Sequence, residues 1–218
     1  MLKTELHVHT RFSPDCATPP EKLVARCQKL GINCLAVTDH NTIQGALAVQ
    51  KLAPFQVIIG EEVKSNAGEI TGLFLKKEIP QGLSPMETVN EIKEQGGLVS
   101  IPHPFDKLRR SVIVPNALKE VLPYADIVEV FNARNTFSSA NDLAMALARE
   151  HGLLMTSVSD SHTLFEIGNT YMDIPNFDNN PHDFLKNLSN AIHNTNKTTP
   201  LIHVLTTLTR NYKKLRKI

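Results

Sequence analysis

Five histidines of this chain stand where short apolar runs end, with carboxylates nearby. The histidines are His7, His9, His40, His103 and His162, and the nearby acidic residues are Asp15, Asp39, Glu61 and Asp160. Residues two positions apart on a strand share a face, so the side chains of His7 and His9 would project together, about 6.5 Å apart. Imidazoles and carboxylates without thiolates favour Zn²⁺, Mn²⁺ or Fe²⁺. Because the set exceeds what one tetrahedral ion can use, we expect two or three divalent ions.

A site of this kind is suited to hydrolysing phosphoesters. A carboxylate such as that of Glu61 can bridge two cations about 3.5–4 Å apart, which then bind a phosphate oxygen and lower the pKa of a trapped water. The charge that spreads over the equatorial phosphoryl oxygens also needs positive partners. Arg109 and Arg110 follow His103 closely and are candidates for that contact. The residues therefore predict a phosphoesterase that attacks with a metal-activated hydroxide.

Apolar, strand-like runs alternate with helix-like segments along most of the chain, which indicates βα units and a parallel sheet or barrel. A first helix is expected between Pro20 and Gly31, and a second around residues 43–52. Polar residues follow each expected strand, and in such folds the carboxyl ends of parallel strands build the site. The expected strands cover residues 6–9, 34–37, 57–59, 98–101, 127–131 and 153–156. The run 69–75 interrupts the alternation and is expected to form a hairpin-like addition.

The C-terminal part differs in kind from the rest. An amphipathic helix is expected from Pro181 through Leu188 to Ile192, and a basic amphipathic helix over residues 204–218. The second helix either docks by its apolar stripe with its charges in solvent, or contacts nucleic acid or anionic lipid. We expect one barrel domain over residues 1–200 and a basic extension over 201–218 that packs on the barrel or projects from it. Its basic residues are Arg210, Lys213, Lys214, Arg216 and Lys217.

Composition indicates an ordinary globular chain with one sizeable core. The 218 residues are 41% hydrophobic and 21% charged, and the formal net charge of +1 argues against binding nucleic acid through bulk charge. The three cysteines lack C-x-x-C spacing, which predicts reduced thiols and no thiolate metal site. The chain has no apolar leader and no run of about 18 apolar residues. We therefore expect a cytoplasmic protein without a membrane partner.

Taken together, the motifs resemble those of the PHP family, the polymerase and histidinol phosphatase domain of metal-dependent phosphoesterases. The resemblance covers nearly the whole chain and implies an α/β fold, a distorted (βα)7 TIM-like barrel, with a trinuclear metal centre. The motifs that carry it are His7-Val8-His9-Thr10 with Ser13-Pro14-Asp15, Thr38-Asp39-His40-Asn41, Gly60-Glu61, Pro102-His103-Pro104 and Ser159-Asp160-Ser161-His162.

The resemblance also implies which residues hold which ion. One ion would be held by His7, His9, Glu61 and Asp160, and a second by Asp15, His40 and His162. Glu61 would bridge to a third ion, which His103 would also bind. Glu69 stands near the position where the family's nucleotide phosphatases carry another histidine. It either replaces that ligand, since a carboxylate suits Mn²⁺ or Zn²⁺, or is an exposed turn residue that leaves a two-ion centre.

Other polar residues of the motifs are expected around these ligands. Asp39 is grouped with Asp160, His162 and Glu61 as catalytic, in the role of orienting His40 or a ligand water. Asn132 and Arg134 would lie on the same rim and either contact substrate or cap the following helix. The remaining histidines, in helical or loop sequence, are expected to be structural: His151, His182, His193 and His203.

The expected substrate is a phosphomonoester or phosphodiester of a small metabolite or nucleotide, nearest to nucleoside monophosphates or 3′,5′-bisphosphates. Histidinol phosphate fits less well, because that branch of the family commonly carries histidine where this chain has Asp15. A second hypothesis is an exonuclease-like enzyme on DNA or RNA ends, with the basic C-terminus guiding the strand. A third is a catalytically inert module that keeps its metal for stability.

Overall fold

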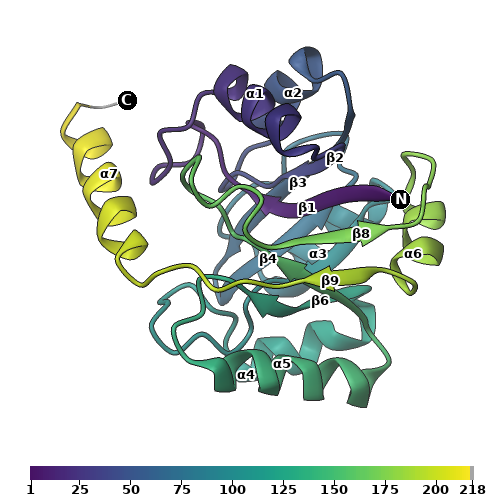
Figure 1. Cartoon of the computed structure of the whole chain (residues 1–218). Helices are drawn as coiled ribbons and strands as arrows, with labels where there is room; N and C mark the ends of the chain where they lie inside the picture. The colour runs from purple at the N-terminus through teal and green to yellow at the C-terminus, as the bar shows by residue number, and fades with distance from the viewer. Residues whose placement is uncertain (217–218) are drawn as a thin grey trace.

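The computed structural model describes residues 1–216 and shows a nearly closed α/β barrel (Figure 1). Within this range, nine strands form one sheet in the order β7-β6-β5-β4-β3-β2-β1-β8-β9. The sheet curls until Val8, at the end of β1 (Leu2–Val8), forms a bridge with Ser161, just beyond β7 (Leu154–Val158). The predicted α/β, TIM-like barrel is confirmed.

Most of the barrel strands run parallel, so their carboxyl ends meet at one face. Besides β1 and β7 these strands are β2 (Cys34–Val37), β3 (Gln56–Ser65), β5 (Leu98–Ile101) and β6 (Ile127–Asn132). The expected hairpin is confirmed, because β4 (Gly68–Leu73) pairs antiparallel with β3, and it also pairs antiparallel with β5. The sheet ends in two antiparallel strands that the sequence did not predict, β8 (Tyr171–Ile174) and β9 (Ile192–Asn194).

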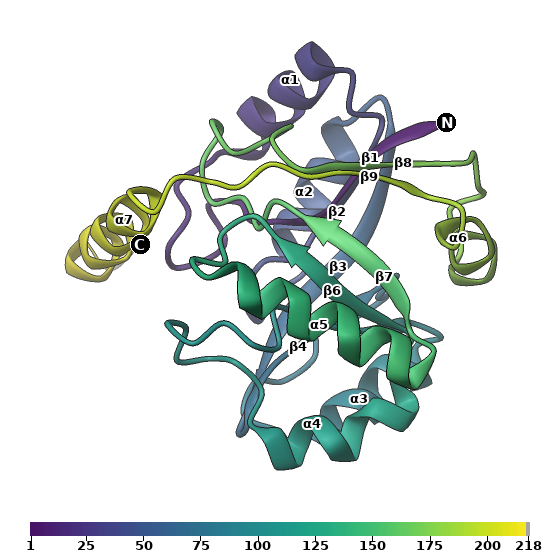
Figure 2. The same cartoon turned by 60° about the horizontal axis from the view of Figure 1, so that its bottom comes forward.

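Helices cover the outside of the sheet (Figures 1 and 2). The helices of the barrel are α1 (Pro20–Leu30), α2 (Gln44–Leu52), α3 (Pro85–Glu94), α4 (Pro115–Val121), α5 (Ser138–His151) and α6 (Pro181–Leu188), with a 3₁₀ turn at Leu122–Tyr124. The first helix ends as predicted, at Gly31 with φ +68°, a conformation that glycine adopts without strain. The predicted extension of α6 to Ile192 is wrong, because the chain turns back after Leu188 and Ile192 pairs with Asp173 of β8.

Alternate residues of the strands pack into different parts of the core. Ile58 of β3 belongs to an inner cluster with Ala36 and Met172, whereas its neighbour Val57 packs with residues of α1 and α2, such as Val49. Because both faces of these strands are buried, their sequences are continuous runs of apolar residues. The three cysteines are buried and unpaired, as expected of reduced thiols.

The last helix, α7 (Ile202–Arg216), projects from the barrel in both views (Figures 1 and 2). The structure contradicts the alternative in which this helix docks by its apolar stripe. Thr206 is buried and Arg210 and Lys213 reach toward the barrel, whereas the apolar side chains Leu201, Val204, Leu205, Leu208, Tyr212 and Leu215 are exposed. Lys217, counted among its basic residues, lies outside the described residues.

None of the helices described for residues 1–216 has the length and apolar character that crossing a membrane requires. The cytoplasmic location stays a prediction.

Candidate metal centre

The carboxyl ends of the barrel strands bring together nine donor residues from distant parts of the sequence. Two histidines come from the end of β1, one follows β2, and a fourth follows β5. Four carboxylates approach from the β1–α1 loop, β3, β4 and the segment after β7, which also carries the fifth histidine. The set is His7, His9, Asp15, His40, Glu62, Glu69, His103, Asp160 and His162, here called the donor cluster. All but His40 are buried, so the donor cluster lies almost wholly out of solvent.

His7 and His9 share a face, as the sequence predicts, with their Nε2 atoms 3.0 Å apart. The imidazole of His9 is central to the donor cluster. Its ring centroid lies 4.0 Å from that of His162 and 4.6 Å from that of His40. Burial, together with these two neighbouring histidines, lowers the pKa of His9 well below its ordinary value. His9 is therefore held neutral, which is the state in which imidazole binds a metal.

One carboxylate, that of Glu62, reaches four histidines. Its Oε2 atom lies 3.0 Å from His40 Nδ1, 3.4 Å from His7 Nε2 and 3.5 Å from His9 Nε2. Its Oε1 atom lies 2.9 Å from His103 Nε2. Glu62 thus lies between these four histidines of the donor cluster, where a bridging carboxylate is expected.

The sequence prediction named Glu61 for this position, and the structure does not bring Glu61 to the donor cluster. Successive side chains of β3 point to opposite faces, and Ile58 faces the inner cluster, so Glu62 faces inward with it and Glu61 faces outward. The Glu61 carboxylate instead accepts a hydrogen bond from the backbone N–H of Ile79 at 3.0 Å. Burial raises the pKa of Glu61 to about 7. The sequence of β3 alone carries no signal that separates Glu62 from Glu61, because pairing across the sheet sets which residues face inward.

Asp160 closes one side of the donor cluster. Its Oδ1 atom lies 3.5 Å from His9 Nε2 and from His162 Nδ1, and 3.7 Å from His7 Nε2. The backbone at Asp160 has φ +52°, and His103 has φ +29°. Such left-handed conformations are uncommon for residues other than glycine, and they cluster at functional sites.

Asp15 and Glu69 complete the set on the other sides. Asp15 Oδ1 lies 3.3 Å from His162 Nε2 and 3.6 Å from His40 Nε2. Glu69 is 4% exposed, which contradicts the alternative of an exposed turn residue. Its two oxygens lie 3.7 Å from His40 Nδ1 and 3.7 Å from His103 Nε2. Glu69 and His103 therefore form a pair on the far side of Glu62, where the family resemblance implies a third ion.

The donor chemistry fits divalent cations. Three triplets have ligand atoms within 4.8 Å of one another: His9, His40 and His162; His7, His9 and Glu62; and His40, Glu62 and Glu69. Four carboxylate oxygens facing the donor cluster are buried without a hydrogen-bond partner: Asp15 Oδ1, Glu62 Oε2, Glu69 Oε2 and Asp160 Oδ1. Buried carboxylate oxygens without a hydrogen-bond partner are costly, and bound cations would remove that cost. The absence of cysteine from the set favours Zn²⁺, Mn²⁺ or Fe²⁺ over a closed thiolate cage.

The charges of the carboxylates support the same conclusion. Burial alone would raise the pKa of Glu62, but the adjacent His7 and His40 hold it well below its ordinary value. For Asp160, Arg109 and His7 likewise outweigh burial and hold the pKa well below its ordinary value. Glu69 differs, since burial and the neighbouring Glu62 raise its pKa. The carboxylates of Glu62 and Glu69 repel each other, and a cation between them would relieve the repulsion.

Residues behind the donor cluster orient its members. Glu129 of β6, which the sequence analysis missed, approaches His7 Nδ1 to 2.5 Å through Oε1 and accepts from the His103 backbone N–H at 3.0 Å through Oε2. Asn132 donates from Nδ2 to Glu129 and to Asp160, both at 3.1 Å. Asn132 therefore does not cap α5, and its side chain is buried rather than facing solvent. Its hydrogen bond positions Asp160. Such partners fix the orientation of metal ligands.

Asp39 acts on the donor cluster indirectly. Its carboxylate accepts from the N–H and hydroxyl of Thr10 at 2.7 and 2.6 Å and from the Ser13 hydroxyl at 2.6 Å. The same hydroxyl lies 3.0 Å from His9 Nδ1. Asp39 does not contact the His40 ring as predicted, because its side chain turns toward the β1–α1 loop. It acts instead on His9, through the hydrogen bonds of Ser13. Asp39 is a positioning residue.

The close approach of α2 to Asp39 gives a prediction at Gly45. A Cβ atom at Gly45 would lie 1.8 Å from Asp39 Oδ2 and 2.4 Å from Thr10 Oγ1, so Gly45→Ala must push these groups apart. We expect a loss of stability of about 1–3 kcal/mol and a roughly 10- to 100-fold weaker affinity for Mn²⁺. Urea unfolding and metal titration measure the two effects. Gln50→Ala, at an exposed position of the same helix, is the control; equal behaviour of the two variants would contradict the prediction.

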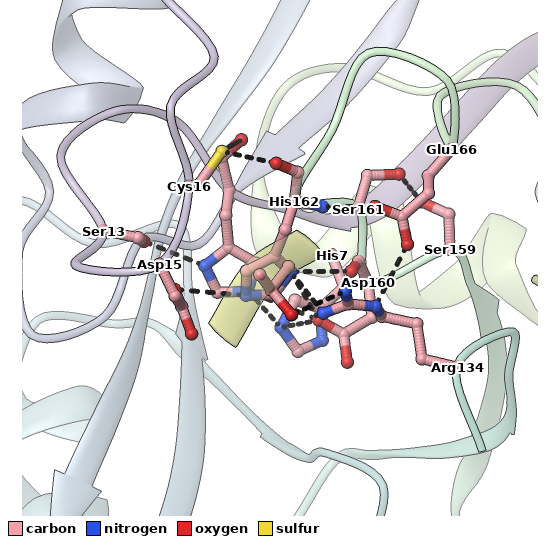
Figure 3. A network of polar contacts seen from close by, with 12 residues as sticks. His7, Ser13, Asp15, Cys16, Arg134, Ser159, Asp160, Ser161, His162 and Glu166 are labelled. Atoms are coloured by element: carbon pink, nitrogen blue, oxygen red, sulfur yellow. Dashed lines mark hydrogen bonds and ion pairs between the residues drawn. The ribbon is translucent and has the colours of Figure 1, made fainter. Parts of the chain in front are cut away.

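The predicted substrate-binding arginines are placed differently from one another. Arg109 lies at the donor cluster, with Nη2 2.5 Å from Asp160 Oδ2, whereas Arg110 is exposed. Arg134 is buried, with Nε 3.0 Å from Glu166 and Nη1 2.9 Å from His162 Nδ1 (Figure 3). Arg134 therefore positions the His162 ring. Glu166, which the sequence analysis missed, forms an ion pair with Arg134 and accepts a hydrogen bond from the backbone N–H of His162.

Among known protein families, the PHP domain matches residues 5–197. Two uncharacterized proteins from Methanocaldococcus jannaschii are each 39% identical to the chain, over 159 and 176 residues, covering 66% and 78% of this chain and 90% and 70% of their own. A 5′-3′ exoribonuclease from Haemophilus influenzae is 32% identical over 131 residues, which cover 57% of this chain and 46% of that enzyme.

Several solved structures share the fold at low sequence identity. A two-domain protein from Bacteroides vulgatus, described as containing a predicted PHP-like metal-dependent phosphoesterase, has a TM-score of 0.73 at 18% identity, covering 89% of this chain and 64% of that one. PsfC from Pseudomonas syringae has a TM-score of 0.68 at 16% identity and covers 97% and 98%. A lesion-specific endonuclease from Pyrococcus furiosus has a TM-score of 0.64 at 14% identity and covers 91% and 59%. The chain spans less than two thirds of the first and third of these structures.

Proposed function

This chain belongs to the PHP domain family, and we propose that it is a divalent-metal-dependent phosphoesterase. The observation that carries the proposal is the donor cluster, with its four buried carboxylate oxygens that lack a hydrogen-bond partner. The description of the Bacteroides vulgatus structure as a predicted metal-dependent phosphoesterase supports the same reaction class. The proposed substrate is a phosphomonoester or phosphodiester of a small metabolite or nucleotide.

The donors divide into three groups around Glu62. We propose that His7, His9, Glu62 and Asp160 hold one ion, and that Asp15, His40 and His162 hold another. Glu69 and His103 would bind a third ion together with Glu62, whose two oxygens face different histidines. When bound, divalent ions would neutralise phosphate charge and lower the pKa of water toward neutrality, whether they are Mn²⁺, Zn²⁺ or Fe²⁺.

The chain supplies the remaining requirements of the reaction. The largely buried donor cluster excludes bulk water, which strengthens electrostatic contacts with a phosphoryl group. Glu129 and the Asp39–Ser13 pair hold His7 and His9 in fixed orientations. Arg109 is partly exposed beside Asp160 and can turn its guanidinium to the equatorial oxygens of a phosphoryl group.

Arg109→Ala is expected to weaken substrate binding and to leave the metals in place. The side chain contributes positive charge but no metal-ligating atom, so KM for p-nitrophenyl phosphate should rise about tenfold, the effect of losing roughly 1.4 kcal/mol of a charge-assisted hydrogen bond. Steady-state kinetics and elemental analysis of the purified variant measure these quantities. Arg110→Ala, at the neighbouring exposed position, is the control. An unaltered KM and rate for Arg109→Ala would remove Arg109 from the site.

The test of the function is phosphate or nucleotide release from a substrate panel. The panel spans p-nitrophenyl phosphate, nucleoside monophosphates, 3′,5′-bisphosphates, histidinol phosphate and short oligonucleotides, each with Mn²⁺ or Zn²⁺ and after chelation. Turnover that depends on the added metal supports a phosphoesterase and ranks its substrates. No turnover across the panel, with metals bound to the protein, would contradict the proposal and favour an inert metal-stabilised module.

A second candidate is an exonuclease-like activity on DNA or RNA ends. The likeness to an exoribonuclease and the cations of α7, which include Arg210, Lys214 and Arg216, favour it. Phosphate contacts release counterions, so such an enzyme would lose affinity for oligonucleotides steeply as salt rises. Equal salt dependence for oligonucleotides and nucleoside monophosphates would reject this candidate.

A further inference from the structure

Beside the donor cluster, α7 and the β1–α1 loop enclose a groove of about 600 Å³. Its walls are Arg11, Phe12 and Ala17 from the loop, and Leu208, Thr209, Tyr212 and Lys213 from α7. Four of the seven residues that line the groove belong to α7, which lies beyond residue 197, where the family match ends. The groove is therefore a feature of this chain that the proposed function does not explain.

Helix α7 is held in place by polar contacts with the residues that carry the site. The Nζ atom of Lys213 donates to the backbone oxygens of Arg11, Ser13 and Cys16 at 2.6, 2.7 and 3.2 Å. Arg210 contacts Asp15 Oδ2 at 3.2 Å. Closer to the start of the helix, the Thr206 hydroxyl accepts a hydrogen bond from Arg134 Nη2 at 3.4 Å. These contacts fix the wall that α7 contributes relative to the donor cluster.

Each wall of the groove exposes one aromatic ring. Phe12 is 40% exposed and Tyr212 is 55% exposed. A guanidinium accompanies each ring, with Arg11 Cζ 6.0 Å from the Phe12 centroid and Arg216 Cζ 5.6 Å from the Tyr212 centroid. Exposed aromatic rings with nearby cations are the elements that proteins use to stack nucleobases next to phosphates.

The groove is also close enough to the donor cluster for one nucleotide to reach both. Phe12 precedes Asp15 by three residues, so their Cα atoms are at most about 11 Å apart. Asp15 Oδ1 lies 3.3 Å from His162 in the donor cluster, while its Oδ2 faces Arg210 of α7. A base in the groove would thus leave its phosphate near the ligands.

We propose that this groove is the base-binding subsite of the enzyme, in which Phe12 and Tyr212 stack on the nucleobase of a nucleoside phosphate or a nucleotide end. The inference rests on the proposed function and specifies its substrate class. It makes α7 the element that selects nucleotides over phosphoesters without a base.

The charges around the groove favour a nucleotide over a second copy of the chain. The exposed leucines at positions 201, 208 and 215 recur every seven residues, which is a spacing that could pair two helices. A parallel pairing of two copies would, however, set the cations of one α7 against the same cations of the other. Those cations are Arg210, Lys213, Lys214 and Arg216, and phosphates complement them.

The experiment measures binding and specificity separately on the 218-residue chain. Binding is followed by calorimetry, with Mn²⁺ present, using the methylenephosphonate analogue of adenosine monophosphate, in which a P–C bond replaces the scissile ester. Specificity is the ratio of kcat/KM for adenosine monophosphate to that for ribose 5-phosphate, which lacks the base. Tyr212→Leu and Phe12→Ala should each weaken analogue binding about tenfold and lower the ratio by a similar factor, as loss of base stacking does.

Two variants serve as controls. Tyr212→Phe keeps an aromatic face and should retain affinity for the analogue, which a merely structural role of the hydroxyl would not predict. Tyr124→Leu replaces a tyrosine of matched exposure, 51%, at the 3₁₀ turn after α4 and should leave binding and the ratio unchanged. The far-ultraviolet circular dichroism spectrum of Tyr212→Leu should match that of the parent chain, as expected if α7 remains helical.

The outcomes separate this inference from the function on which it rests. Hydrolysis of ribose 5-phosphate with an unchanged ratio in Tyr212→Leu would overturn the subsite and leave the phosphoesterase intact. Analogue binding that depends on Tyr212, without hydrolysis of any ester, would support the subsite and contradict the function. If Tyr212→Leu changes only the sedimentation of the protein, from dimer to monomer, α7 is a self-association surface and the subsite is overturned.

Discussion

Glu62→Gln is expected to abolish hydrolysis and to lower the metal content, whereas Glu61→Gln keeps both. Glu62 belongs to two of the three ligand triplets, and its two oxygens reach four histidines. An amide of the same shape carries no charge and replaces one ligating oxygen with an NH₂ group, which binds no cation. We expect kcat/KM to fall by at least about 10³-fold, or roughly 4 kcal/mol, as removal of preorganised charge stabilisation typically does.

The neighbouring variant is the matched control, because it makes the same chemical change one residue away. The carbonyl oxygen of a glutamine at position 61 can still accept the hydrogen bond from Ile79 N–H that the carboxylate accepts now. Elemental analysis for Mn²⁺ or Zn²⁺ and hydrolysis of p-nitrophenyl phosphate are measured on both variants. Loss of metal and activity in Glu61→Gln, with Glu62→Gln unaffected, would show that the side chains of β3 face opposite to the structure.

Asp160→Asn is expected to have an effect of similar size with the fold retained. Asp160 contacts His7, His9 and His162 and is the charged partner of Arg109. Asparagine tolerates the left-handed backbone at φ +52° about as well as aspartate, so the substitution removes charge without adding backbone strain. We expect kcat/KM to fall at least about 10²- to 10³-fold.

Thermal unfolding with and without Mn²⁺ provides a readout for this variant that does not depend on turnover. A ligand that binds only the folded state raises the Tm, so the Mn²⁺-dependent rise should shrink in Asp160→Asn. Asp173→Asn is the control, since Asp173 lies in β8. Among the side-chain contacts described for residues 1–216, its carboxylate accepts a hydrogen bond only from Asn194. Full turnover and an unchanged Mn²⁺-dependent rise in Asp160→Asn would remove Asp160 from the ligand set.

The sequence alone determined the chemistry and most of the scaffold. Local patterns are enough for this, since apolar runs form strands, Pro20 and Gly31 delimit a helix, and residues that follow parallel strands gather at one face. The pairing of His7 with His9, and the places of His40, His103, Asp160 and His162, follow from the same rules. Glu69 also takes the place that the resemblance suggested as one alternative.

Only the tertiary structure decided between side chains whose local sequence is equivocal. Glu61 and Glu62 are adjacent, of the same residue type and both buried, so the choice depends on which face of β3 meets the barrel interior. That face is set by pairing across the sheet, which the composition of one strand does not encode. The short strands β8 and β9 escaped prediction for a similar reason, because they are held by pairing with β1 and with each other.

The C-terminal helix shows the same limit most clearly. Its sequence determines an amphipathic, basic helix, and periodicity predicts burial of the apolar stripe. In the structure, Thr206, Arg210 and Lys213 face the barrel instead, because the β1–α1 loop presents carbonyl oxygens and Asp15 that need donors. Sequence periodicity specifies which residues share a face, and the partner surface, assembled from residues nearly 200 positions away, decides which face is buried.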